Sequence, residues 1–411
     1  MGWESRKIHK ENRPLKVQIN IKDSCIMSTI NKKEIAIFDF YLGGHHIEYL
    51  HHIYMHAIED ATTSYTFILP NNFDKFGGKM SWPKANNIRF IFFELDDKYV
   101  RSLKTLEKAR ILSRLLKKFA DKTGIKEFVL IETMVFMPYI PLYLGRKAKI
   151  TSILYHIPMF SKNSSFKSKF YSKMNLWLLA NAPCFKKICL LNSTEAVEFY
   201  NKEFKTKRFS FIPDPYVPIE CEKPLSAIRE ELGISPSKKV FIHFGGLTRR
   251  KGTLEILDAL FLVDKDCLKN MAFIFAGRVI EDIKEEFYNK INQLKEKVQI
   301  IVFDQFCEYS LFAEICRIAD YIMIPYRNTA QSSGVCSYAA QFGVPVIGPA
   351  EGLLGNIINK FKLGVGFPAL NSVKIAKILQ ENIYKEILQD KEFANSYLRI
   401  STPQNFCQHL I

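Results

Sequence analysis

The chain has 411 residues, of which 47% are hydrophobic, 13% aromatic and 24% charged, and its formal net charge is +16. This balance is that of a globular protein and excludes a collagen, a coiled coil and a disordered tail. The length predicts two or three domains. No apolar run reaches the roughly 18 residues that a membrane-spanning helix needs. Because residues 1–20 contain no apolar signal core, we expect a cytoplasmic chain.

The nine cysteines are scattered along the chain. Cys184 and Cys189 are the closest pair, and no Cys-x-x-Cys occurs. This spacing argues against a disulfide framework or a zinc ribbon, and reduced thiols are typical of the cytosol.

Predicted strands alternate with predicted helices along the whole sequence. The first series of strands lies at residues 35–40, 65–69, 88–94, 128–131, 150–156, 188–191 and 209–212. The second series lies at residues 240–244, 272–276, 299–303, 321–324 and 345–347, with helical patterns at 254–261, 283–294 and 311–319. This alternation predicts α/β architecture with parallel sheets covered on both faces, and two series predict two doubly wound, Rossmann-like domains.

Four prolines between residues 213 and 224 indicate the domain boundary. We therefore expect an N-terminal domain at 1–215 and a C-terminal domain at 216–390. Residues 391–411 are expected to form a helical segment that packs back on the N-terminal domain. In doubly wound sheets the loops after the strands carry the ligand site, so these loops hold the candidate functional residues.

The first half of the chain carries the positive charge. Residues 1–215 hold 35 Lys and Arg against 20 Asp and Glu, whereas residues 216–411 hold 23 against 22. The excess of positive charge is concentrated in residues 98–187, which have 19 basic and 4 acidic side chains. Within it, residues 100–120 and 166–180 combine apolar positions at helical spacing with Lys and Arg. This region predicts an anionic partner, which can be a membrane, a lipid diphosphate or nucleic acid.

Five of the nine histidines follow the first predicted strand, namely His45, His46, His51, His52 and His56. His52 and His56 share a helix face, and His45 lies two turns earlier. No cysteine or carboxylate completes a ligand set at good spacing, so metal binding is the less favoured interpretation. We favour a polar face toward a ligand cleft.

A glycine-rich and basic loop follows the first strand of the second series and opens a helix. It contains Gly245, Gly246, Arg249, Arg250 and Lys251. Glycines let the backbone approach a ligand, a helix start offers free N–H groups, and the cations can neutralise a diphosphate. The spacing is neither that of a Walker A loop nor that of the dinucleotide fingerprint. The alternative is a turn with solvated cations.

A second anion site is predicted around residues 331–347. Ser332, Ser333 and Gly334 precede a short helix of small residues that begins at Val335. The amides at this helix start point toward the cleft, and Gly343 ends the helix before the next strand.

At these residues the sequence resembles GT-B glycosyltransferases. The order and spacing of 251–252, 273–277, 319–322 and 343–347 are similar to those of their nucleotide-binding half. Residues 235–366 resemble glycosyltransferase family four, also called group one. The first half is similar more loosely, through Gly43-Gly44 and His156. The resemblance implies a GT-B fold, a UDP- or GDP-sugar donor, a saccharide or lipid-linked acceptor, and no metal cofactor.

The resemblance also implies roles for single residues. Lys251 would hold the donor diphosphate, together with the backbone amides of Ser333, Gly334 and Val335. His156 would contact the transferring sugar, and Gly43 and Gly44 would close over it. The resemblance favours a retaining reaction. An inverting reaction would need a base near the acceptor hydroxyl, for which the candidates are Asp39, His45, His46 and Glu48.

The sequence departs from the family pattern at two places. Gly246 stands where arginine is usual, and Arg249 or Arg250 is expected to replace it. The usual pair of glutamates around the phosphate helix is missing, because it falls on Ala330 and Tyr338, or on Gln331 and Ala339. Tyr338 is then the candidate to offer a hydroxyl to the ribose.

These features predict a glycosyltransferase of cell-surface polysaccharide or glycan synthesis, peripheral on the inner face of the cytoplasmic membrane. One alternative is a nucleotide-sugar-binding protein whose catalysis is weakened by the missing glutamates. Another is a basic nucleic-acid-binding protein, which only the charge supports, and no nucleic-acid partner is expected because no RNA or DNA motif occurs. A UDP-sugar epimerase is disfavoured by the basic half of the chain.

Overall fold

A computed structural model describes residues 19–22, 32–78, 80–94, 100, 102–161 and 165–411. The polar N-terminal segment before Ile19 and the predicted helical position Arg101 lie outside these residues. Contacts divide the described chain into two compact units, one within Met1–Ser152 and Ala182–Lys186, the other within Ile153–Asn181 and Lys187–Ile411. The domain limits expected from the prolines stay a prediction.

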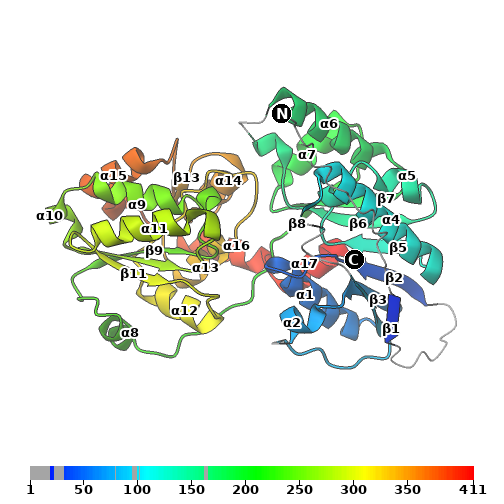
Figure 1. Ribbon diagram of the computed structural model, residues 1–411, viewed down its shortest axis with the longest axis horizontal. Coiled ribbons are helices and arrows are strands. Elements are labelled where there is room, and N and C mark those ends of the chain that lie inside the picture. Colours follow the sequence, from blue (N-terminus) through cyan, green and yellow to red (C-terminus); the bar gives the residue numbers. More distant parts are fainter. Residues whose placement is uncertain (1–18, 23–31, 79, 95–99, 101, 162–164) are drawn as a thin grey trace, which may run out of the picture. The chain divides into compact units, whose positions relative to one another are not determined.

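The first sheet has eight strands in the order β1-β4-β3-β2-β5-β6-β7-β8 (Figure 1). The strands are β1 (Ile19–Lys22), β2 (Lys33–Phe38), β3 (Thr63–Pro70), β4 (Ile88–Phe93), β5 (Glu127–Leu130), β6 (Lys149–Leu154), β7 (Phe185–Leu191) and β8 (Phe209–Ile212). The pairs from β4 to β6 and the pair β7–β8 are parallel, whereas β1 runs antiparallel to β4. All seven strands predicted for this half are confirmed, and β1 is an addition.

The helices of the first half begin with α1 after the first predicted strand. They are α1 (His45–Glu59), α2 (Phe73–Gly77), α4 (Thr105–Thr123), α5 (Ile140–Leu144), α6 (Phe166–Asn181) and α7 (Thr194–Glu203), with short 3-10 turns η1 (Met134–Phe136) and η2 (Pro158–Phe160). The helix expected over 100–120 begins later, because Lys104 before it is extended. The buried stripe of α4 includes Leu112, Leu116 and Phe119, so its apolar face packs on its own core.

The second sheet has six parallel strands in the order β11-β10-β9-β12-β13-β14. They are β9 (Lys239–Phe244), β10 (Met271–Ala276), β11 (Gln299–Phe303), β12 (Tyr321–Met323), β13 (Val346–Pro349) and β14 (Gly364–Phe367). All five predicted strands of this half are present, and β14 was not predicted. The chain winds outward in both directions from β9, so the strand order reverses between β9 and β12.

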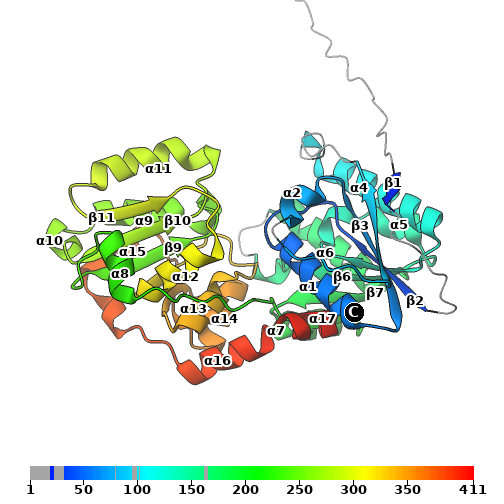
Figure 2. The same ribbon diagram turned by 90° about the horizontal axis from the view of Figure 1, so that it is seen from below.

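Helices cover both faces of the second sheet, with α9, α11 and α15 on one side and α12 on the other (Figure 2). The helices are α8 (Leu225–Glu231), α9 (Thr253–Phe261), α10 (Lys265–Leu268), α11 (Glu281–Leu294), α12 (Tyr309–Ile318), α13 (Val335–Phe342), α14 (Gly352–Lys360), α15 (Ser372–Gln380), α16 (Lys391–Ile400) and α17 (Pro403–Leu410), with 3-10 turns η3 (Arg249–Lys251) and η4 (Ile383–Glu386). The core is aromatic at its centre, where Phe241 stacks on Phe273 and Tyr321 at centroid distances of 5.1 and 5.2 Å.

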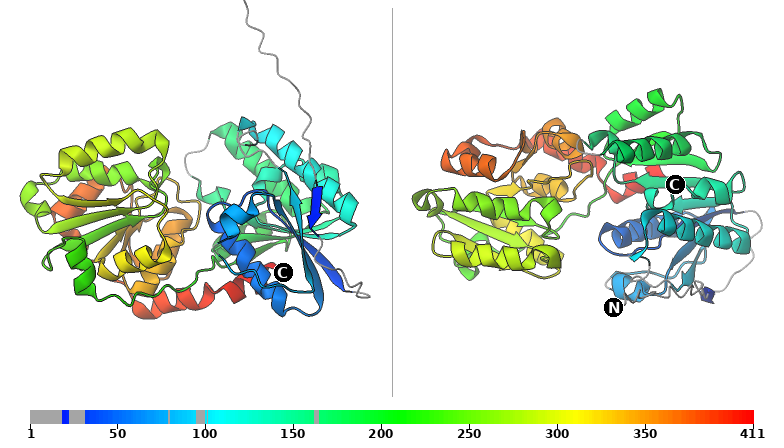
Figure 3. Two further views of the ribbon diagram at one scale, coloured as in Figure 1. Left: turned by 60° about the horizontal axis from the view of Figure 1, so that its bottom comes forward. Right: turned by 45° about the horizontal axis from the view of Figure 1, so that its top comes forward.

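The chain ends with two consecutive helices, α16 and α17 (Figure 3). Helix α17 packs on β8, where the His409 ring meets Phe211 edge-on and the His409 carbonyl accepts a hydrogen bond from the Lys187 ammonium. No helix in the described part of the chain is both long enough and apolar enough to cross a bilayer.

Candidate functional site

The loop between β9 and α9 is folded so that Lys251 turns back over its own glycines. Gly245 and Gly252 have backbone φ angles of 90° and 72°, which residues other than glycine rarely adopt. A Cβ on Gly252 would lie 2.0 Å from the Pro325 carbonyl oxygen, and one on Gly245 would lie 2.5 Å from Lys251 Nζ. The ammonium of Lys251 lies 5.4 Å from the centre of the Tyr326 ring. These contacts hold a cation at the carboxyl end of β9.

His243 fastens this loop from inside the sheet. The side chain is buried, Nδ1 donates to the Met323 carbonyl at 2.8 Å, and Nε2 accepts from the Thr253 hydroxyl at 3.0 Å. Burial lowers the pKa of His243 to about 4, so the ring is neutral at pH 7. Thr253 Oγ1 in turn accepts from the Thr248 amide at 3.1 Å. Sequence reasoning missed this residue, although a histidine inside an apolar strand was the available signal.

The loop between β12 and α13 lies against the β9–α9 loop. The Arg327 amide donates to the Arg250 carbonyl at 2.9 Å, and Arg250 Nη1 lies 3.4 Å from Gln331 Oε1. Tyr326 Oη lies 3.3 Å from Ser333 Oγ. Tyr326 therefore has the Lys251 ammonium on its ring and the Ser333 hydroxyl at its tip. The two loops predicted to bind anions therefore lie side by side where the strand order reverses.

The remaining predicted residues of these loops face different neighbours. Arg249 Nη2 pairs with Glu286 Oε2 of α11 at 3.0 Å, which turns it toward the outer helix. Gly246 belongs to the turn after β9, and Gly334 and Val335 form the start of α13. Of the three cations, Lys251 and Arg250 thus contact the β12–α13 side.

Ser332 and Tyr338 contact residues that follow β7 and β8 and the last residue of β9. The Ser332 hydroxyl donates to Asp214 Oδ2 and accepts from Asn192 Nδ2, both at 2.8 Å, and Asp214 is buried. The Tyr338 ring lies 6.4 Å from each of Tyr216 and Phe244, between centroids. The Ser332 side chain therefore anchors the loop, and contact of Tyr338 with a ribose stays a prediction.

His156 lines a cavity of about 780 Å³ next to these loops. The His156 loop is tied to the β12–α13 loop, since the Ile157 amide donates to the Ala330 carbonyl at 3.0 Å. His156 Nε2 lies 2.9 Å from Ser161 Oγ, and burial lowers the pKa of the ring. The cavity wall also contains Tyr326, Arg327, Glu255, Glu351, Thr329 and Asn371. Sequence reasoning had not singled out any of these six residues.

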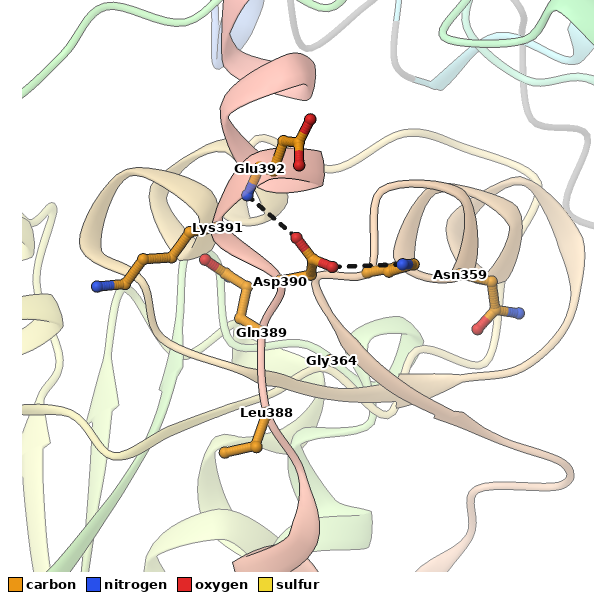
Figure 4. Close-up of a pocket in the computed structure, with 8 residues that line it drawn as sticks. Asn359, Gly364, Leu388, Gln389, Asp390, Lys391 and Glu392 are labelled. Atoms are coloured by element: carbon orange, nitrogen blue, oxygen red, sulfur yellow. Dashed lines mark hydrogen bonds and ion pairs between the residues drawn. The ribbon is translucent and has the colours of Figure 1, made fainter.

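A second hollow of about 680 Å³ lies at the start of α16 and contains none of the predicted site residues (Figure 4). Asp390 accepts from the amides of Glu392 and Phe393 and pairs with Lys362 at 3.3 Å, so it caps the helix. We assign this hollow to the packing of the chain before α16.

In the first half of the chain, the structure brings Asp39 and His46 together and leaves His45 outside. Asp39 follows β2 and is 2% exposed, and its Oδ2 lies 2.7 Å from His46 Nδ1. Burial disfavours the charged ring, but the Asp39 carboxylate outweighs it and raises the pKa of His46. Burial also raises the pKa of Glu132, which follows the adjacent strand β5. His45 is exposed and pairs with Glu48 at 3.1 Å.

Two glycines connect this cluster to α1. A Cβ on Gly43 would lie 2.4 Å from Tyr41 Oη, and Gly44 has φ of 62° just before the helix. These glycines allow the close approach of Tyr41 and the turn into α1.

The other histidines of α1 have separate surroundings. His51 Nε2 donates to the Ser81 carbonyl at 2.9 Å, and burial lowers the pKa of His52 to about 4. Among the residues that the structure describes, no three His, Cys, Asp or Glu side chains gather as metal ligands.

No protein-family model matches the sequence, and no curated protein matches it. Solved structures match over 92% of the chain. WaaG, a glycosyltransferase involved in lipopolysaccharide biosynthesis, is 13% identical over 97% of its own chain, with a TM-score of 0.62. HepE of Anabaena in complex with UDP-glucose is 15% identical over 98%, with a TM-score of 0.61. The UDP-forming α,α-trehalose-phosphate synthase of Burkholderia vietnamiensis is 11% identical over 98%, with a TM-score of 0.65. The predicted α/β architecture is confirmed, and the chain has the GT-B fold.

Proposed function

We propose that the chain is a glycosyltransferase that moves a sugar from a nucleoside-diphosphate sugar to a saccharide or lipid-linked acceptor. The observation that carries the proposal is the arrangement of Lys251, Tyr326 and Ser333 beside the cavity that contains His156. It lies where the order of parallel strands reverses, which is the usual place for nucleotides in such sheets. The similar fold of HepE, which was solved with UDP-glucose, supports a nucleotide-sugar donor.

The residues of this site suit the departure of a diphosphate. Negative charge grows on the leaving phosphate, so the Lys251 ammonium and the amides at the starts of α9 and α13 would lower the barrier. These groups need no metal ion, and we propose that none takes part. His156 is held by Ser161 and is kept largely neutral by burial, so it can share hydrogen bonds with sugar hydroxyls. We propose a retaining reaction, in which the donor sugar keeps its configuration.

The decisive experiment separates an enzyme from a binding protein. Thermal shift and calorimetry with UDP, GDP and a panel of their sugars would identify the donor, and product analysis with oligosaccharide and lipid-linked acceptors would follow transfer. We expect one nucleotide class to bind and its sugar to be transferred. Binding without transfer or hydrolysis would favour the weakened-catalysis alternative, which the missing pair of glutamates supports in either register. Binding of neither nucleotide would refute the proposal.

We further propose that the enzyme works on the inner face of the cytoplasmic membrane, in polysaccharide or glycan synthesis. Helix α6 leaves Phe166, Phe170 and Trp177 exposed by 85%, 67% and 55%, at positions that share one helix face. Lys167, Lys169 and Lys173 lie between them. An aromatic face with flanking lysines suits an anionic bilayer surface. The involvement of WaaG, which has a similar fold, in lipopolysaccharide biosynthesis is consistent with this setting.

A further inference from the structure

One carboxylate in the wall of the 780 Å³ cavity has an unmet hydrogen-bonding capacity. Glu255 lies in the first turn of α9, four residues after Lys251, and is 8% exposed. Its Oε1 accepts a hydrogen bond from Arg327 Nε. Its Oε2 is buried and accepts no hydrogen bond within the described part of the chain. A buried carboxylate oxygen without a donor is unfavourable, so this position calls for a donor from outside the protein.

Glu255 lies in the proposed nucleotide-sugar site, so the missing hydrogen-bond donor can come from the bound sugar nucleotide. Arg327 follows Tyr326, whose ring carries the Lys251 ammonium, and both side chains line the same cavity as Glu255 and His156. The two oxygens of a carboxylate can accept from different donors, so Oε1 can stay paired with Arg327 while Oε2 accepts from a ligand. Ala330, in the loop over this cavity, has no polar side chain that could serve instead.

We infer that Glu255 is a specificity-determining residue that accepts a hydrogen bond from a hydroxyl of a neutral donor sugar in this cavity. This inference rests on the proposed function. The charged residues of the described wall are Glu255, Glu351 and Arg327, and Arg327 is already paired with Glu255. The wall thus has two carboxylates and one cation, and that cation is already in an ion pair. This charge balance disfavours a sugar acid, because the wall would repel its carboxylate. Neutral hexoses offer hydroxyl donors, and Glu255 Oε2 has no donor among the described residues.

The test compares affinities for sugar and for nucleotide alone. In calorimetry with UDP-glucose and UDP, or GDP-mannose and GDP if guanine nucleotides bind, Glu255→Gln should weaken binding of the sugar nucleotide about tenfold or more. It should leave the affinity for the plain diphosphate within about twofold. UDP-glucuronate should bind wild type more weakly than UDP-glucose does, and Glu255→Gln should narrow that difference because a negative charge is removed.

Asp258→Asn is the matched control. Asp258 lies on the same helix and pairs with Lys290 at 2.5 Å, away from the cavity wall. This variant should change neither the preference for the sugar nucleotide over the plain diphosphate nor the preference for UDP-glucose over UDP-glucuronate. A folded Glu255→Gln variant that keeps the full preference for the sugar nucleotide would overturn the inference and leave the proposed function intact. Wild type that gains no affinity from any sugar would overturn it as well. Binding of neither UDP nor GDP would instead refute the proposed function itself.

Discussion

The two sheets offer opposite chemistry at corresponding places. In the first sheet, Asp39 and Glu132 follow the adjacent strands β2 and β5, and His46 joins them from α1. In the second, the loops that follow β9 and β12 carry Lys251 and Tyr326, beside Ser333. Both places are points where strand order reverses. The same topology thus carries a carboxylate–imidazole cluster suited to protons and hydroxyls in one sheet, and a cationic cluster suited to phosphate in the other.

Removal of the cation from the second cluster should have the largest effect. Lys251→Ala loses a charge-assisted contact to the diphosphate, which should weaken nucleoside-diphosphate binding by about 2 kcal/mol and lower turnover by a further hundredfold or so. Calorimetry and initial rates would measure both. Lys265→Ala removes an exposed lysine of the same unit and should change neither. Unchanged diphosphate affinity in a folded Lys251→Ala variant would disprove the assignment.

His156 sharpens the comparison, because we expect it to act on the sugar rather than the phosphate. His156→Ala should lower turnover about a hundredfold while diphosphate affinity stays within a few fold. Ser161→Ala keeps the ring but removes its 2.9 Å hydrogen-bond partner, so it should give a smaller loss. Equal turnover of His156→Ala and wild type with the natural acceptor would show that the cavity does not hold the reacting sugar.

The first cluster can be broken through Asp39. The folded-state pKa of His46 is raised, so the charged pair contributes stability that is full below the unfolded-state pKa of roughly 6.5 and is lost as pH rises through the folded-state pKa. Asp39→Asn should therefore cost about 2 kcal/mol near pH 6 and less near pH 9. Thermal melts across this range and NMR titration of His46 would measure it.

An exposed pair on the same helix provides the control for Asp39. Glu48→Gln breaks the contact with His45, where solvent screens the charges, and should cost less than about 0.5 kcal/mol. A pH-independent loss in Asp39→Asn would mean that His46 does not carry the charge.

The excess positive charge of the first 215 residues is a second difference between the two halves of the chain. Substitutions in α6 test whether this charge attracts an anionic membrane. Each of Lys167→Gln, Lys169→Gln and Lys173→Gln should weaken binding to anionic liposomes by about 1 kcal/mol, and Phe170→Ser with Trp177→Ser should weaken it as well. Co-sedimentation with neutral and anionic vesicles at several salt concentrations would show this. Phe306→Ser, which changes an aromatic side chain that is 77% exposed in the loop between β11 and α12, is the matched control. Equal binding to neutral and anionic vesicles would contradict membrane attraction by charge.

The fold was largely predictable because its signals are local. Apolar runs such as those of β9 and β10 are flanked by turn residues and recur at regular spacing, so their type and order could be read directly. The short edge strands β1 and β14 could not be predicted from the sequence. Gly364–Phe367 contains two glycines and none of its four residues is buried, so only the pairing with β13 identifies it as a strand.

By itself, the sequence determined the glycine and lysine loop after β9 and the serine and glycine start of α13, because these residues act through backbone geometry and charge at a strand end. Only the tertiary structure decided which side chains share a cavity. Glu255 and Arg327 are 72 residues apart in sequence, and the pairing of β9 with β12 brings their loops together. In the same way, the pairing of β2 with β5 brings together Asp39 and Glu132, which follow these two strands. Long-range strand pairing, which local patterns do not encode, therefore selected the residues of the candidate site.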